Sequence, residues 1–139
     1  MQDYDLLLRG PVTNDADDLI KLVKEYCEEH NKDYDEENIK MYLYVQMKQV
    51  PCIVAVLDNK VVGAISFIIL PDHYKSDKFY AEKIAVFVSK DQRNKGIGTA
   101  LLNKAEEICK QQNVKQFYFE GPVRPKGYKE VEVKYVKEL

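Results

Sequence analysis

Residues 84–105 read IAVFVSKDQRNKGIGTALLNKA, and this stretch decides the fold. β-Branched and aromatic residues fill its first part, from Ile84 to Val88, and these residue types favour a strand. The polar, charged and glycine-bearing residues that follow are typical of a loop. From there on, apolar residues recur at the spacing of an amphipathic helix, at Ile97, Leu101, Ala105 and Ile108. The local order is therefore predicted to be strand, glycine loop and helix.

A helix that starts directly after a glycine-bearing loop offers a place for an anion. The backbone N–H groups of its first turn lack partners inside the helix, and the helix dipole adds partial positive charge there. Gly96 and Gly98 allow close approach of a ligand and a positive φ, while Arg93 and Lys95 add charge. The loop is predicted to hold a phosphate or pyrophosphate. The alternative interpretation is an ordinary strand-to-helix turn whose glycines serve packing.

Composition narrows the classes of protein to which the chain can belong. Its 139 residues, 45% of them hydrophobic, fit one compact domain over residues 1–139. A net charge of −2 and the lack of a dense basic patch argue against a nucleic-acid partner. No run is long enough to span a membrane, and the first residues do not read as a signal peptide. The three cysteines fit reduced side chains in the cytoplasm, and two histidines argue against a histidine-based metal centre.

Hydrophobic periodicity and turn residues divide the whole chain into short elements without a repeat or a linker. The 52–57 segment is continuously apolar, which predicts a strand buried on both faces. The resulting order of elements is β-α-α-β-β-β-α-β-β. The predicted helices cover about 15–30, 36–48 and 97–112, and the predicted strands cover 4–9, 52–57, 61–70, 79–88, 114–120 and 127–139.

The spacing Arg93-x-x-Gly96-x-Gly98, placed between a strand and a helix, resembles the R/Q-x-x-G-x-G/A signature of the GNAT superfamily of acyl-CoA-dependent N-acyltransferases. The likeness extends to Val88, five positions before Arg93, and to the Thr-Ala-Leu-Leu that follows Gly98. The resemblance implies an α/β fold built on a mixed sheet, and the order of elements agrees with it over most of the chain. It also implies that the phosphate ligand is acetyl-CoA, which serves as the acyl donor.

The resemblance places the donor in a splay of the sheet, between the strand that ends at Val88 and the strand predicted from about Val114. The amide groups of its pantetheine arm would pair with the backbone of Phe87 and Val88, as an added strand does. For the side chains of Arg93 and Lys95 two interpretations stay open, phosphate contact or solvated loop charges. The pyrophosphate would sit on the backbone N–H groups of Arg93, Asn94, Lys95, Gly96, Ile97, Gly98 and Thr99.

In the reaction that the resemblance implies, an amine attacks the thioester carbon directly, so a base must take the proton of the amine. Negative charge develops on the thioester oxygen, and the N–H group of Val88 would stabilise it. The first candidate base is Glu82, which period-two counting puts on the same face as Ile84, Val86 and Val88. The alternative is a surface glutamate paired with a lysine. His73 is the second candidate, since imidazole titrates near neutrality. The alternative there is an incidental loop residue.

The departing thiolate needs a proton, which many members of the family supply from a tyrosine on a helix after the fifth strand. Here the resemblance weakens, because Pro122 and Pro125 leave no room for a regular helix before Gly127. That helix is therefore predicted to be missing. Tyr118 and Tyr128 are the substitute candidates for the acid. The alternatives are that they pack against other residues and that water supplies the proton.

The implied acceptor is a primary amine, either a small molecule or the amine of a lysine side chain or an N-terminus. The junction of the first two helices is acidic, which fits either attraction of a cationic amine or an ordinary solvated surface. The main alternative function is a non-catalytic module that binds acyl-CoA or another protein, and a nucleotide-phosphate binder outside the family is a third. An unpaired last strand at 127–139 would be a natural homodimer edge. The sequence thus predicts a cytoplasmic acetyltransferase without nucleic-acid or membrane partners.

Overall fold

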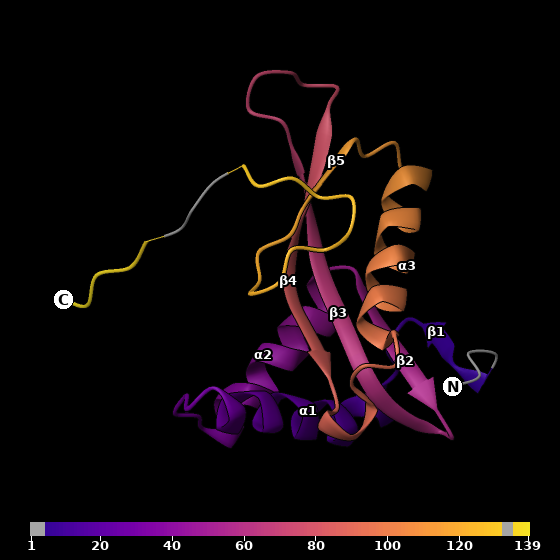
Figure 1. Ribbon diagram of the computed structural model, residues 1–139, viewed down its shortest axis with the longest axis vertical. Coiled ribbons are helices and arrows are strands. Elements are labelled where there is room, and N and C mark those ends of the chain that lie inside the picture. The colour runs from indigo at the N-terminus through magenta and orange to yellow at the C-terminus, as the bar shows by residue number, and fades with distance from the viewer. Residues whose placement is uncertain (1–4, 132–134) are drawn as a thin grey trace.

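The computed structural model of the protein describes residues 5–131 and 135–139. Within these residues, three α-helices and five strands follow one another as Figure 1 shows. None of these helices is long and apolar enough to cross a membrane. Short 3₁₀ turns, η2 (Thr13–Asp15) and η3 (Lys90–Gln92), precede the first helix and follow the fourth strand. The elements are β1 (Leu7–Arg9), α1 (Ala16–Glu29), α2 (Glu36–Gln49), β2 (Cys52–Leu57), β3 (Lys60–Pro71), β4 (Phe79–Val88), α3 (Ile97–Gln111) and β5 (Gln116–Tyr118).

The strands form one mixed sheet in the order β1-β2-β3-β4-β5. Each neighbouring pair is antiparallel except β4 and β5, which are parallel. α1 and α2 cover one face of the sheet and α3 covers the other (Figure 1). α3 also connects the two parallel strands, which need a long crossover to run in the same direction. The predicted α/β fold with a mixed sheet is confirmed.

Hydrophobic side chains pack on both faces of the sheet, so its central strands are buried twice. On the α3 face, Ile65 and Phe67 of β3 share a cluster with Leu101 of the helix, and all three are fully buried. On the other face, Val54 of β2 shares a cluster with Leu19 of α1. This double burial explains why the 52–57 segment is continuously apolar rather than alternating.

Gly63 lies where α3 packs on the sheet without room for a side chain. A Cβ at this position would lie 3.0 Å from the Phe87 carbonyl oxygen and 3.2 Å from side-chain atoms of both Ile97 and Leu101. These distances are shorter than ordinary contacts, so an alanine would push the helix or the neighbouring strand away. The glycine inside β3 therefore sets how closely the start of α3 approaches β4.

β4 carries a bulge at Ile84. Ser66 of β3 pairs with Ala85, but the next residue of β3, Phe67, pairs with Lys83. Ile84 is therefore an extra residue on β4, and the alternation of side chains between the two faces shifts by one at this point.

The chain beyond β5 departs from the sequence-based expectation. β5 is three residues long, shorter than the predicted 114–120 strand. Neither a helix nor a strand occurs in the described residues 119–131 and 135–139, so the helix is missing as predicted but the strand at 127–139 is not found there. Residues 132–134 of that prediction lie outside the described residues. Tyr135 and Val136 are almost fully exposed, because their alternating pattern has no sheet edge against which to bury.

An ion pair ties β1 to the start of α1. Arg9 donates to both carboxylate oxygens of Asp15, at 2.8 and 3.1 Å, and the backbone N–H of Val12 donates to the same carboxylate at 2.8 Å. Asp15 is only 5% exposed, and these bonds, above all those from Arg9, hold its pKa below the ordinary value. A carboxylate of this kind stabilises the fold above its unfolded pKa of about 3.9, and the contribution is lost as the pH falls below that value.

We expect Asp15→Asn to lower the free energy of unfolding by about 1.5–3 kcal/mol at neutral pH, the range for a hydrogen bond to a charged group. The gap to the wild type should narrow as the pH falls below about 4, because the wild-type carboxylate then takes up a proton. Urea unfolding followed by circular dichroism at a series of pH values measures both effects. Asp17→Asn is the matched control, since Asp17 is exposed in the same first turn. Equal losses in both variants would contradict a special role for the Arg9–Asp15 pair.

Candidate functional site

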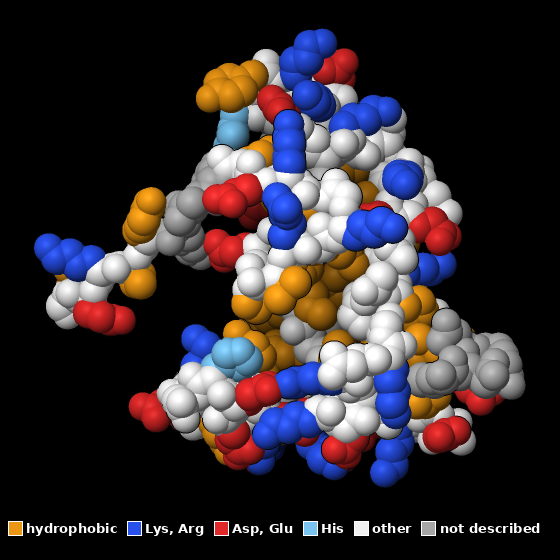
Figure 2. Space-filling model, in the orientation of Figure 1, with side chains coloured by type: hydrophobic (Ala, Val, Ile, Leu, Met, Phe, Trp, Pro, Cys, Tyr) orange, Lys and Arg blue, Asp and Glu red, His pale blue; other side chains and the backbone are white. Residues whose placement is uncertain are grey.

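β4 has one open edge over its second half. Within the described residues, 85–88 have a strand partner only on the β3 side. Figure 2 shows a hollow floored by hydrophobic side chains beside this part of β4 and below the loop that follows β5. The sheet thus opens between the end of β4 and β5, as the sequence predicts. The two strands separate after three paired positions, Tyr80–Gln116, Ala81–Phe117 and Glu82–Tyr118.

The backbone groups of β4 alternate between β3 and this open edge. The Ser89 N–H donates to a carbonyl of β3 at 2.8 Å, so Phe87, two residues earlier, also turns its backbone groups toward β3. The position of the Phe87 carbonyl beside Gly63 agrees with this direction. Val86 and Val88 consequently turn their N–H and C=O groups to the open edge. The Phe87 backbone groups thus face β3 rather than this edge, and the roles of Phe87 and of the Val88 N–H in binding a ligand stay predictions.

The loop after β4 passes twice through the left-handed region before α3 starts. Asn94 has a φ of 62°, and Gly96, the N-cap residue of α3, has a φ of 82°. Gly98, in the first turn, lies next to the Val88 side chain, since a Cβ there would be 3.8 Å from Val88 Cγ2. No side chain caps this turn, and the turn has no acidic residue. Uncapped N–H groups at the start of α3 therefore lie beside the open edge of β4, a combination that suits an anion attached to an extended chain.

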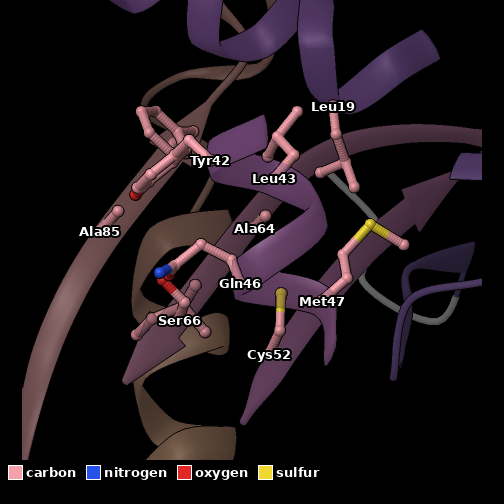
Figure 3. A pocket seen from close by; sticks show the side chains of 11 residues that line it. Leu19, Tyr42, Leu43, Gln46, Met47, Cys52, Ala64, Ser66 and Ala85 are labelled. Carbon is pink, nitrogen blue, oxygen red and sulfur yellow. The ribbon is translucent and has the colours of Figure 1, made fainter. Parts of the chain in front are cut away.

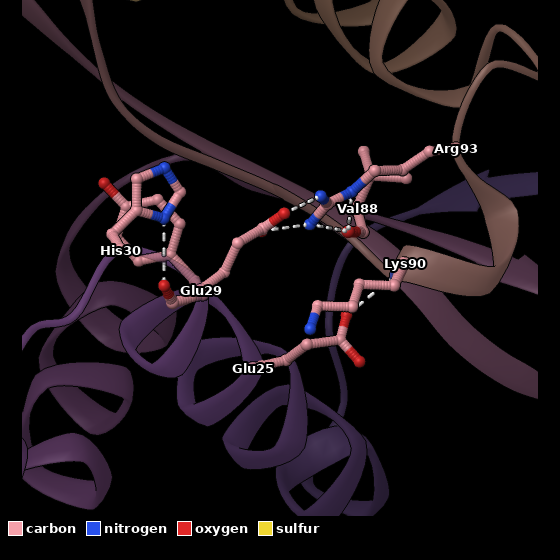
Figure 4. A network of polar contacts seen from close by, with 7 residues as sticks. Glu25, Glu29, His30, Val88, Lys90 and Arg93 are labelled. Carbon is pink, nitrogen blue, oxygen red and sulfur yellow. Dashed lines mark hydrogen bonds and ion pairs between the residues drawn. The ribbon is translucent and has the colours of Figure 1, made fainter.

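Two glutamates of α1 hold this loop in place, as Figure 4 shows. Glu25 accepts a hydrogen bond from the Lys90 backbone N–H at 2.7 Å. Glu29 pairs with both terminal nitrogens of the Arg93 guanidinium, and its Oε1 accepts from Nη2 at 2.7 Å. The same guanidinium donates to the Val88 carbonyl from Nε at 3.3 Å and from Nη2 at 3.2 Å. The hydrogen bonds that Arg93 donates to Glu29, together with the positive charge of Arg93, hold the pKa of Glu29 below its ordinary value.

The Arg93 side chain therefore has a role that the sequence did not indicate. Phosphate contact and solvent exposure were the two interpretations, but the guanidinium instead joins α1 to the end of β4 and anchors the loop. Lys95, by contrast, lies at the exposed surface, where it donates to Gln92 at 3.1 Å. The loop thus presents its backbone, rather than the Arg93 guanidinium, to a ligand.

Glu82 lies on the face of the sheet opposite α3, so the prediction that it shares a face with Val86 and Val88 is wrong. Ala81, Val86 and Val88 all pack with the core on the α3 face, and Glu82, which follows Ala81, points the other way. The bulge at Ile84 shifts the alternation by one, which period-two counting cannot detect. The Glu82 side chain is exposed and makes no hydrogen bond or ion pair with another described residue.

Aromatic residues lie around Glu82 on this face. Tyr118 of β5 is its cross-strand neighbour, and the Tyr118 ring stands edge-on to the Tyr80 ring at a centroid distance of 5.6 Å. The His73 ring lies 6.4 Å from that of Tyr80. The structure thus brings together three of the predicted catalytic candidates, Glu82, His73 and Tyr118, around Tyr80. Sequence reasoning missed Tyr80, although its position two residues before Glu82 places both on one face.

Tyr128, the fourth candidate, lies on the other face of the sheet. Its hydroxyl donates to Glu106 of α3 at 2.6 Å, and its ring packs against the core beside Phe119, at a centroid distance of 6.2 Å. Burial and the Glu106 hydrogen bond raise the pKa of Tyr128. A tyrosine held in this way is a weak proton donor, and it is separated from the Glu82 group by the sheet.

Two hollows lie beside α1 and α2, and neither is a formed substrate site. The smaller, shown in Figure 3, has a volume of about 20 Å³, room for about one water molecule. Gln46 points from α2 into it, and its Oε1 is buried without a hydrogen-bond partner in the described chain. The larger hollow, of about 460 Å³, is wide open and is lined by Tyr42 and by Asp33 and Asp35. It corresponds to the acidic junction of the two helices, whose aspartates are exposed.

The cysteines are free thiols in the described chain. These are Cys27, Cys52 and Cys109, and burial raises the pKa of Cys52 to about 11. At neutral pH that side chain is therefore a protonated thiol rather than a nucleophilic thiolate. No group of three or more His, Cys, Asp and Glu side chains among residues 5–131 and 135–139 is arranged to hold a metal ion.

The sequence model of the acetyltransferase (GNAT) family matches residues 16–123. This range holds everything from α1 through β5, and so it includes the open edge of β4 and the glycine loop. The chain belongs to the GNAT acetyltransferase family.

Individual proteins are similar to this chain in sequence or in structure. The chain is 43% identical over 61 residues to the uncharacterized protein YxbD of Bacillus subtilis (strain 168), a match that spans 42% of this chain and 31% of that protein. Its structure is similar to the ribosomal-protein-alanine N-acetyltransferase of Brucella melitensis biovar Abortus 2308, with a TM-score of 0.77 and 18% identity over 98% of this chain and all 100% of that one. It is also similar to an aminoglycoside acetyltransferase from an uncultured soil metagenomic sample, solved with sisomicin, with a TM-score of 0.72 and 20% identity over 97% of each chain. At these identities the structural likeness shows a shared fold.

Proposed function

We propose that residues 1–139 form one N-acetyltransferase domain that moves an acetyl group from acetyl-CoA to a primary amine by direct attack. The observation that carries this proposal is the open edge of β4 beside the uncapped first turn of α3. A strand edge pairs with the amide groups of an extended ligand, and a helix N-terminus binds an anion. Acetyl-CoA offers both, with amides in its pantetheine arm and a diphosphate beyond it.

In this proposal the diphosphate sits on the backbone N–H groups of residues 93–99, and the pantetheine arm extends along Val86 and Val88. An N–H group at the open edge of β4, that of Val86 or Val88, donates to the thioester oxygen as negative charge develops on it. The amine nitrogen forms a bond to the carbonyl carbon while the carbon–sulfur bond breaks, and the amine proton passes to Glu82 through water. The thiolate takes its proton from water or from Tyr118, since Tyr128 donates to Glu106.

The acceptor is proposed to be a cationic primary amine, either a small molecule or a protein amine. Structural neighbours are named for ribosomal-protein alanine and for aminoglycosides, so both kinds of amine belong in a test panel. Free cysteines are typical of proteins in the reducing cytoplasm, and we propose that location for the enzyme.

Release of free CoA thiol from acetyl-CoA tests the proposal, with a panel that holds a polyamine, an aminoglycoside and a lysine-containing peptide. We expect turnover with at least one amine and an acetylated product in the mass spectrum. Binding of acetyl-CoA without turnover of any amine would support the alternative, a non-catalytic acyl-CoA-binding or protein-interaction module. The lack of a helix after β5 within residues 119–131 and 135–139 favours that alternative. ATP binding without any thermal shift from acetyl-CoA would contradict both.

Arg93 and Glu29 should act as one unit in acetyl-CoA binding. We expect Arg93→Ala and Glu29→Ala each to weaken binding by about threefold to tenfold, because the loop loses its link to α1. The double variant should bind no more weakly than Arg93→Ala alone, since each single change already breaks the same ion pair. Isothermal titration calorimetry of the three variants measures the coupling. Additive losses would show instead that Arg93 contacts the phosphate independently of Glu29.

A further inference from the structure

An aromatic and acidic surface lies at the point where the sheet opens, on the face opposite α3. We call it the ammonium surface; its members are Tyr80 and Glu82 of β4, Tyr118 of β5 and His73 of the loop between β3 and β4. Glu82–Tyr118 is the last pair before β5 ends, so this surface borders the open edge of β4 directly. A group bound to it would lie next to whatever occupies that edge.

The rings of this surface hold one another in position. Tyr80 and Tyr118 make an edge-to-face contact with an interplanar angle of 78°, and the His73 ring is tilted by 50° against Tyr80. Asp72 fixes the loop that carries His73, because its carboxylate accepts a hydrogen bond from the Tyr74 backbone N–H at 2.8 Å. Tyr118 remains 39% exposed, so a ligand can reach its ring.

Glu82 gives this surface its negative charge, and none of its members is a lysine or an arginine. The Glu82 side chain makes no ion pair or hydrogen bond with another described residue. The neighbouring lysine, Lys83, lies on the opposite face of the sheet, where it donates to the Glu120 carbonyl and sits 4.8 Å over the Phe119 ring. A cation is attracted here in two ways, by the charge of the carboxylate and by the negative faces of the neighbouring phenol rings.

We propose that Tyr80, Glu82 and Tyr118 bind the acceptor as a primary ammonium ion whose carbon chain carries no carboxylate next to the nitrogen. The inference rests on the proposed function and deepens it, because it names the class of amine. An α-carboxylate would lie close to Glu82 and be repelled by its like charge, and no lysine or arginine belongs to this surface to compensate. The acceptors are therefore amines such as decarboxylated amino acids or lysine side chains, and free α-amino acids are excluded.

Phenethylamine and phenylalanine form the matched pair of probes, since they differ only in the α-carboxylate. With saturating acetyl-CoA, we expect phenethylamine to be acetylated and phenylalanine to be used at least about tenfold less efficiently, as the cost of placing like charges together. Tyr118→Leu should raise the KM for phenethylamine by about fivefold or more, whereas Tyr118→Phe, which keeps the ring face, should change this KM by less than about twofold, whatever the loss of the hydroxyl does to kcat. The KM for acetyl-CoA should be unchanged in both variants.

Two results would overturn the inference: equal use of the two probes, or the same KM for phenethylamine in Tyr118→Leu and Tyr118→Phe. A chemical-shift titration of the ¹⁵N-labelled protein with phenethylamine covers the case in which no amine is turned over. Shifts at Tyr80, Glu82 and Tyr118 that Tyr118→Leu weakens would then support the ammonium surface while the proposed acetyl transfer fails. A lack of shifts at these residues would show that the ammonium surface does not bind the amine, whatever the outcome of the activity assay.

Discussion

Alanine in place of Gly96 should weaken acetyl-CoA binding by about tenfold to a hundredfold. The φ of 82° at this position costs an alanine about 1–2 kcal/mol, so the loop is expected to relax and turn the first N–H groups of α3 away from the diphosphate. Losing one charge-assisted hydrogen bond costs about 1.5–3 kcal/mol, which corresponds to that change in affinity. Isothermal titration calorimetry with acetyl-CoA measures the effect directly.

Gly127→Ala is the matched control for this variant. Gly127 has a φ of 87°, and a Cβ there meets nothing within 4 Å, as at Gly96, but the residue lies outside the loop before α3. The two variants should lose similar amounts of thermal stability, and only Gly96→Ala should lose affinity. Equal affinities in both variants would mean that the loop conformation does not affect acetyl-CoA binding, and this result would contradict the proposed diphosphate site.

The spacing of hydrophobic residues predicts most of the sheet and all three helices, because in each of these elements that spacing matches the side of the element that is buried. β4 was predicted over the same residues that the structure shows, and α3 starts at Ile97 in both. The β-branched run before the loop and the helical spacing after it leave little room for another arrangement. The loop glycines, Gly96 and Gly98, could be assigned to a tight turn for the same reason, since such a turn between a clear strand and a clear helix favours glycine.

The sequence did not predict features that depend on contacts between segments far apart in the chain. The partner of Arg93 is Glu29, which is 64 positions earlier, and nothing near either residue indicates the pair. The bulge at Ile84 is revealed only by the register with β3, because the residues on both sides of it, Lys83 and Ala85, are half-buried and their types do not mark it. A single inserted residue therefore moved Glu82 from the α3 face to the opposite one.

The end of the chain shows the limit of alternation as a signal. The 127–139 segment alternates as a strand does, but a strand also needs a neighbour with free backbone groups in register. The described part of this segment has no such neighbour, and its apolar side chains are exposed. Tyr128 was predicted to lie on this strand, yet its hydroxyl is bonded to Glu106 of α3, a contact that period-two counting does not reveal.

Glu82→Gln should lower kcat by about a hundredfold to ten-thousandfold, the usual range for loss of a general base. Glutamine has nearly the same size, and the side chain is exposed without partners among the described residues, so the fold should be unaffected. In the proposed arrangement acetyl-CoA contacts the backbone of Val86, Val88 and residues 93–99 and not the Glu82 side chain, so its affinity should not change. Steady-state kinetics with saturating acetyl-CoA and a varied amine give kcat and the KM for the amine separately.

These two parameters distinguish a base from a binding group. If Glu82 only attracts the ammonium ion, Glu82→Gln raises the KM for the amine and leaves kcat intact, because saturating amine restores full occupancy. If Glu82 takes the proton, kcat falls however much amine is present. Glu107→Gln, an exposed change on α3, controls for the loss of one negative charge. A fall of kcat in His73→Ala without one in Glu82→Gln would move the role of base to the imidazole, which lies on the same surface beside Tyr80.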